Sequence, residues 1–91
     1  MEIIPISQVF YGIFFHINIM SSINIAKAVG ENLKQARLIC GITQKQIAAE
    51  LKKGQADYSD YETGKIQLDY EKIVFLCKRF GITPNDLFDF D

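Results

Sequence analysis

Residues 52–65, KKGQADYSDYETGK, and Gln44 shortly before them carry a dense set of polar side chains. The amides of Gln44 and Gln55 can each donate and accept hydrogen bonds, and the lysine ammonium groups can pair with anions. Two carboxylates, Asp57 and Asp60, stand among them. This mixture suits the reversible recognition of another polar surface and offers little for bond-making chemistry.

Groups that serve covalent, metal or phosphate chemistry are sparse. His16 is the only histidine, and no nucleophile or pair of acids at metal-ligand spacing accompanies it. Cys40 and Cys77 lie 37 positions apart without a CxxC motif, so we expect two buried, reduced thiols, with a disulfide or redox role as the alternative. The six glycines stand singly. The sequence predicts a non-enzyme without metal or cofactor.

The overall charge gives no global attraction for a polyanion. Ten Lys and Arg residues face eleven Asp and Glu residues, for a net charge of −1 and a pI of about 5.7. Any affinity for nucleic acid must therefore come from a local patch. A chain of 91 residues with 48% apolar residues fits one folded domain with a small stability margin.

From residue 21 onward the chain reads as five helices. The first has Ser22 or Asn24 as its cap, Gly41 as its stop and Gly30 as a possible later start. Thr43 and Gln46 form a capping box that opens the second. The residues expected to face inward from these two helices are Ile25, Val29, Leu33, Ala36, Cys40, Ile47, Ala48 and Leu51.

The third helix is expected over Gln55–Thr63, between the break Lys52-Lys53-Gly54 and Gly64. Asp69 caps the fourth, which stops at Gly81, and Thr83-Pro84 opens the fifth with a cap followed by a proline at the first helical position. The inward-facing residues expected here are Tyr58, Tyr61, Ile73, Leu76, Cys77 and Phe80.

The run GITQKQIAAELKKGQADYSDYETGK, residues 41–65, resembles the helix-turn-helix of the Cro and lambda-repressor-like family, also called the xenobiotic response element family. Downstream, IVFLCKRFGITPNDLF resembles the closing pair of helices of that family. The resemblance covers about residues 24–90, with the helix-turn-helix at about 43–63. The matching positions are Arg37, Gly41, Thr43-Gln44, Ile47-Ala48, Leu51, Ser59, Glu62 and Gly64.

This resemblance implies a mainly α, five-helix fold whose second helix meets the phosphate backbone and whose third helix lies in the major groove. Arg37 and Glu62 would form an ion pair that ties the third helix to the first. Gln55 would contact bases, since its amide can pair bidentately with adenine. The DNA-binding residues implied are Gln44, Lys53, Gln55, Ala56, Asp57, Ser59, Asp60 and Lys65, with Gln44 and the two lysines at phosphates.

The third helix carries two acids, Asp57 and Asp60, although a helix that faces a polyanion is expected to carry neutral or basic side chains. Asp57 is third in the helix, where a carboxylate satisfies free amides and the positive end of the dipole. Asp60 can accept from the exocyclic amine of cytosine while repelling phosphates, which sharpens specificity at a loss of affinity. Alternatively, the helix meets a basic protein partner in place of DNA.

Residues 1–20 have a different composition from the rest. No charged side chain occurs between Glu2 and Lys27, and 13 of the first 20 residues are apolar. From Ile13 onward, Ile13, Phe15, Ile17 and Ile19 fall on one face of an extended chain and His16 and Asn18 on the other. We therefore expect a β-strand, or a hairpin turning near Tyr11-Gly12. A helical domain over residues 21–91 has no sheet to cover such an arm, which predicts a homodimer held partly by these strands.

Other interpretations of residues 1–20 stay open. Pro5, Ser7, Gln8, His16 and Asn18 interrupt the segment, which weakens a membrane span. A signal peptide needs a positive start, and Glu2 has the wrong sign. A third possibility is a poorly structured extension ahead of Met20.

The leading functional hypothesis is a cytoplasmic transcriptional regulator of a bacterium or phage. As a homodimer it would bind an inverted repeat in double-stranded DNA and act as a repressor. Antitoxins and restriction-modification control proteins share this fold and length. The alternative, favoured by the acidic helix and near-zero charge, is a protein-interaction module that binds a toxin or another protein.

Overall fold

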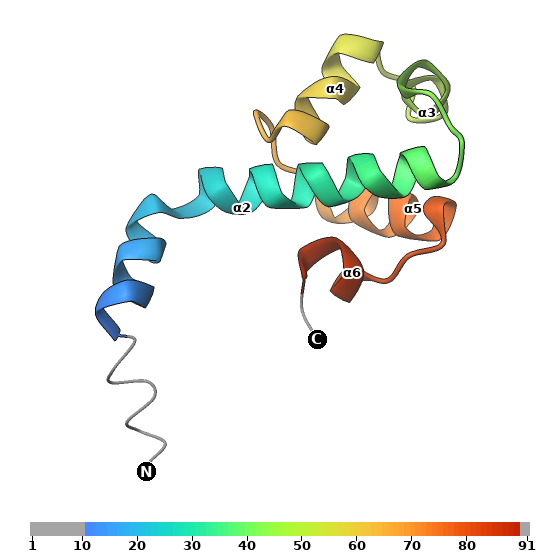
Figure 1. Ribbon diagram of the computed structural model, residues 1–91. Coiled ribbons are helices and arrows are strands. Elements are labelled where there is room, and N and C mark those ends of the chain that lie inside the picture. Colours follow the sequence, from blue (N-terminus) through green and yellow to red (C-terminus); the bar gives the residue numbers. More distant parts are fainter. Residues whose placement is uncertain (1–10, 90–91) are drawn as a thin grey trace.

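The computed structural model describes the backbone of residues 11–89 and the side chains of residues 25–89. This part of the chain forms five α-helices and no strand. Figure 1 shows the long helix α2 through the middle, with α3 and α4 on one side of it and α5 and α6 on the other. The helices are α2 (Tyr11–Ile39), α3 (Gln44–Glu50), α4 (Gln55–Thr63), α5 (Tyr70–Phe80) and α6 (Pro84–Phe88).

The predicted helix boundaries after residue 40 are confirmed by the cap geometry. The Thr43 hydroxyl accepts from the amide of Gln46, whose side chain accepts from the Thr43 amide, as a capping box requires. Asp69 caps α5 by accepting from the amide of Lys72. Thr83 opens α6 with a second capping box, followed by Pro84 at the first helical position. Local sequence thus defines where these short helices begin.

Each helix contributes one large, fully buried side chain to a single core. These residues are Leu33 from α2, Ile47 from α3, Tyr58 from α4, Leu76 from α5 and Leu87 from α6. Burial of an aliphatic side chain of this size stabilises a fold by roughly 1.5–3 kcal/mol. Removing any one of them would therefore loosen the contact of a whole helix.

Two glycines bring the backbones of α2 and α4 into direct contact. A Cβ atom on Gly30 would lie 2.5 Å from the carbonyl oxygen of Tyr61, and one on Gly64 would lie 2.6 Å from the Cα of Lys27. Gly64 also has a φ of 81°, the left-handed conformation that ends α4. Gly30 is therefore a packing residue in mid-helix, and the later helix start considered for it is wrong.

The strand expected within residues 1–20 is wrong for residues 11–20, which form the start of α2. The hairpin turn expected near Tyr11-Gly12 is likewise wrong, and residues 1–10 lie outside the described part of the chain. A short run of Ile and Phe fits a strand or a helix equally well. Extending an existing helix by a residue costs far less than nucleating a new one, so the segment continues α2 across the boundary expected at residues 20 and 21.

Two residues expected in the core, one within α2 and one just after its end, are instead at the surface. Ile25 is 59% exposed, and Cys40 is exposed with its thiol donating to the Phe80 carbonyl at 3.4 Å. Cys77 is buried as predicted, and both thiols are free. Burial raises the pKa of Cys77. Among the described residues, no helix combines the length and apolar character that crossing a bilayer requires.

Candidate nucleic-acid interface

Helices α3 and α4 and the turn between them form a compact helix-turn-helix. The turn depends on Lys52, whose φ of 58° is left-handed, and on the amide of Lys53, which donates to the Ala48 carbonyl at 2.9 Å. Gly54 then adopts an extended conformation as the cap of α4. The predicted break at residues 52–54 is confirmed, and it sets the angle at which α4 leaves α3.

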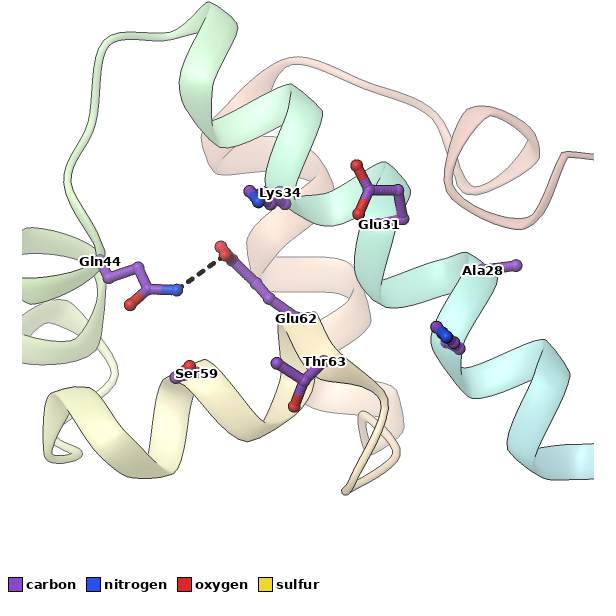
Figure 2. A pocket seen from close by; sticks show the side chains of 8 residues that line it. Ala28, Glu31, Lys34, Gln44, Ser59, Glu62 and Thr63 are labelled. Atoms are coloured by element: carbon purple, nitrogen blue, oxygen red, sulfur yellow. Dashed lines mark hydrogen bonds between the residues drawn. The ribbon is translucent and has the colours of Figure 1, made fainter.

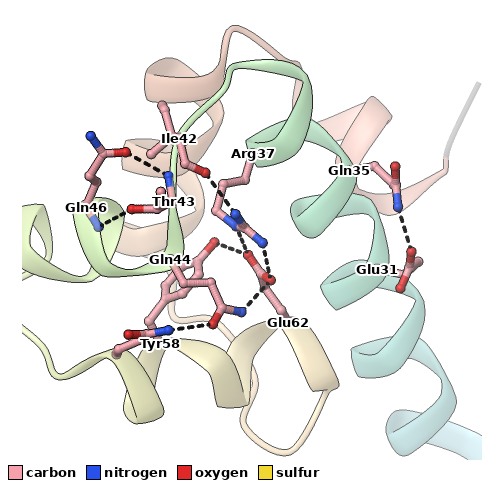
Figure 3. Close-up of polar contacts among 10 residues, drawn as sticks. Glu31, Gln35, Arg37, Ile42, Thr43, Gln44, Gln46, Tyr58 and Glu62 are labelled. Atoms are coloured by element: carbon pink, nitrogen blue, oxygen red, sulfur yellow. Dashed lines mark hydrogen bonds and ion pairs between the residues drawn. The ribbon is translucent and has the colours of Figure 1, made fainter.

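A buried ion pair holds α4 against α2. Nε of Arg37 donates to Glu62 Oε2 at 2.6 Å and Nη2 donates to Oε1 at 3.1 Å, while Nη1 donates to the Ile42 carbonyl at 2.8 Å. The same carboxylate accepts from the Tyr58 hydroxyl at 2.7 Å (Figure 3). Both charged side chains are less than 10% exposed. The predicted pair of Arg37 and Glu62 is confirmed, and it is a structural pair.

Protonation equilibria follow from this arrangement. Burial alone would raise the pKa of Glu62, but hydrogen bonds from Arg37, Tyr58 and Gln44 outweigh it and hold the pKa below its usual value. The hydrogen bond to Glu62 raises the pKa of Arg37. Burial, followed by the bond to Glu62, raises the pKa of Tyr58. At neutral pH Arg37 and Glu62 therefore stay charged, and Tyr58 stays protonated.

Gln44 lies between the buried network and the exposed start of α4. Its amide nitrogen donates to Glu62 Oε1 at 2.9 Å (Figure 3). Its amide oxygen accepts from Gln55 Nε2 at 3.3 Å. The two amides are thereby aligned side by side at the junction of α3 and α4. Bonding to Glu62 uses donor capacity of Gln44, so its predicted phosphate contact would come from its remaining N–H.

The other residues predicted to bind DNA are exposed or half-exposed along α4 and near its two ends. Tyr58, Tyr61 and Glu62 face inward, which leaves the opposite side of α4 free. Lys53 extends over the Tyr61 ring, with its Nζ 5.8 Å from the centroid, beside the start of α4. The exposed or half-exposed residues of this reading face are Gln55, Ala56, Asp57, Ser59 and Asp60, with Lys65 exposed just past the end of the helix.

The chain matches the sequence model described as "Helix-turn-helix domain" over residues 30–89, more than half of its length. It belongs to the helix-turn-helix domain family. The resemblance to Cro and lambda-repressor-like regulators is thus confirmed. The fold is similar to that in the crystal structure of the DNA-binding domain of BldD, with a TM-score of 0.64 and 19% identity over 74% of this chain and 97% of that one. Comparison with the curated proteins gave no match.

In this helix-turn-helix protein, an open cleft beside the reading face is lined by Gln44 and Ser59 together with residues that the sequence did not single out. Figure 2 shows Lys34 of α2 facing the same space as Gln44 of α3 and Ser59 and Thr63 of α4. Lys27, seven positions before Lys34, also lines it. A spacing of seven places two lysines on one helix face. That spacing is visible in the sequence, but their proximity to α4 depends on how α2 and α4 pack.

Proposed function

We propose that this protein is a sequence-specific regulator of transcription that binds double-stranded DNA through α4 as a homodimer on an inverted repeat. The observation that carries the proposal is the division of α4 into two faces. One face is fixed to α2 by the ion pair of Arg37 and Glu62. The other presents Gln55 and its neighbours to the outside on a rigid helix.

The linked amides of Gln44 and Gln55 support base reading by α4. Gln55 is exposed in the first turn, and its bond to Gln44 restricts the directions in which its amide can point. A restricted amide loses less conformational freedom when it pairs with adenine N6 and N7. Gln55 therefore acts as the main base contact, with Ala56 and Ser59 offering small surfaces beside it.

Phosphate binding falls to a few cations, because the whole chain is close to neutral. Lys53 and Lys65 lie at the two ends of α4, where the flanking backbones of a major groove would pass. Their small number predicts a moderate salt dependence of the affinity. We infer a repressor role, because a protein bound at a promoter excludes RNA polymerase from it.

The experiment is a selection from a randomised double-stranded DNA pool with the full chain, followed by sequencing. We expect an inverted repeat whose half-sites lie about one helical turn apart. Gln55→Ala should lose the preference at one position of each half-site. Asn85→Ala, which removes an exposed amide on α6 across α2 from the reading face, is the matched control and should keep it. Recovery of no enriched sequence would refute the proposal.

A second candidate function is favoured by the acids of the reading face. Asp57 is exposed and Asp60 half-exposed, and neither has an ion-pair partner among the described residues. A face with two unpaired carboxylates fits a basic protein surface, such as that of a toxin in an antitoxin pair. Selective capture of a basic protein together with failure of the DNA selection would support this function over the first.

A further inference from the structure

Helix α5 carries a second apolar face that nothing in the described chain covers. Its inward side packs Leu76, Cys77 and Phe80 into the core. On its outward side Tyr70 is 87% exposed, Val74 52% and Phe75 39%. A surface helix needs one apolar stripe to join its own domain, and a second, contiguous one marks an interaction surface.

Two opposite charges flank this outward stripe. Glu71 stands near its beginning and Lys78 near its end, both exposed. Neither is in an ion pair within the described residues, whereas their neighbours on α5 are: Lys72 with Asp69 at 2.8 Å and Arg79 with Glu50 at 2.7 Å. The stripe therefore presents an acidic end, an apolar centre and a basic end.

The order of these residues is symmetrical about the centre of the helix. Val74 and Phe75 are the central residues of the stripe. Glu71 lies three positions before Val74, and Lys78 lies three positions after Phe75. In an antiparallel pair of α5 helices related by a twofold axis, Glu71 would face Lys78 of the second copy and Val74 would face Phe75. A parallel pair would oppose like charges. The stripe is thus complementary to itself in one orientation.

We propose that the α5 face, comprising Tyr70, Glu71, Val74, Phe75 and Lys78, binds the same face of a second copy of this chain. The apolar surface continues past Tyr70 to Ile66 and Phe88, which line an adjoining groove and enlarge the area buried. In Figure 1 α5 lies across α2 from α3 and α4, so this pairing leaves the reading face open. The inference deepens the homodimer of the proposed function and does not depend on its DNA contacts.

The test is sedimentation equilibrium of the full chain without DNA. Wild type should form a dimer. Glu71→Lys and Lys78→Glu should each weaken association by about tenfold, since either one places like charges at both symmetric contacts. An equimolar mixture of the two variants should regain the wild-type affinity, because two lysines of one copy then face two glutamates of the other. Lys45→Glu on α3 is the control for net charge and should dimerise as wild type.

Three results would overturn the α5 interface. One is a wild-type monomer up to about 1 mM. Another is a dimer that both charge variants leave unchanged, which would place the interface elsewhere on the chain. The last is a mixture that associates no better than either variant alone. Because DNA is absent, failure of the DNA selection would leave this result unaffected, and the two proposals fail separately.

Discussion

Arg37 of α2 and Glu62 of α4 form a bidentate ion pair, with a shorter contact of 2.6 Å, on the buried side of α4. The pair fixes the orientation of α4, and Gln44 extends it to α3 by donating to the same carboxylate at 2.9 Å. Helices α2, α3 and α4 are thus connected through one carboxylate. The reading face is exposed, but its support is buried.

Replacing Arg37 with Met should destabilise the protein severely. The substitution keeps a long side chain but leaves Glu62 buried without its cation, which costs about 3–5 kcal/mol. Urea denaturation followed by circular dichroism measures the free energy of unfolding. Glu50→Gln, which breaks the exposed pair with Arg79, is the control and should change it far less. Equal losses in the two variants would contradict the structural role of the buried pair.

Stability should fall in acid partly through Glu62. Its pKa in the folded protein is below the usual carboxyl value of 4.5, so its ionised form stabilises the fold above that value. This contribution is lost as the pH falls through the lowered folded pKa. The free energy of unfolding between pH 7 and pH 3 should therefore decrease less steeply in Glu62→Gln than in wild type. Asp69 and Glu50, whose pKa values are also lowered, are present in both proteins and cancel in the comparison.

Gly30→Ala should force α2 and α4 apart. The added methyl group would meet backbone atoms of Tyr61 and Glu62, which cannot rotate away, and overpacking of this kind costs about 1–3 kcal/mol. Thermal unfolding measures the loss. Gly54→Ala is a matched control, because its φ of −73° suits any residue and no atom lies within 4 Å of an added Cβ. Gly30→Ala behaving like Gly54→Ala would show that the two helices tolerate separation.

Lys53 and Lys65 should contribute affinity without sequence preference. Changing either to Gln should reduce the slope of log affinity against log salt by about one and leave the selected sequence unaltered. Fluorescence anisotropy at several salt concentrations gives the slope. Gln55→Ala should do the opposite, changing preference by about 1–3 kcal/mol per half-site while keeping the slope. Unchanged slopes in both lysine variants would remove these residues from the interface.

The double change Asp57→Asn and Asp60→Asn should strengthen binding to DNA of any sequence. It removes two negative charges from the face that approaches phosphates, and it keeps amide groups of the same size. Binding to the selected site and to a scrambled one should both tighten, with a smaller ratio between them. If affinity for both DNAs stays the same, the carboxylates do not face DNA.

Local sequence signals predicted most of the helix-turn-helix. Thr43, Asp69 and Thr83 fix helix starts by bonds within three residues, so no tertiary information was required. The partnership of Arg37 and Glu62 came from the family resemblance. By contrast, the bond between Gln44 and Gln55 and the cleft lysine Lys34 depend on how whole helices pack, which spacing alone does not reveal.

The errors near the start of the chain have a physical cause. Apolar runs such as residues 11–20 satisfy strand and helix patterns alike, and the helix that follows decides the outcome. Cys40 is the last apolar position of a periodic series, but the helix ends at Ile39 and the chain turns away before the residue can be covered. Periodicity predicts a face of a helix, and it does not say how far the partner surface reaches.

Gly30 and Gly64 also couple the orientation of α4 to that of α2. Because backbone touches backbone at both positions, no deformable side chain lies between α2 and the end of α4. A rotation of α2 is therefore transmitted to α4 instead of being absorbed.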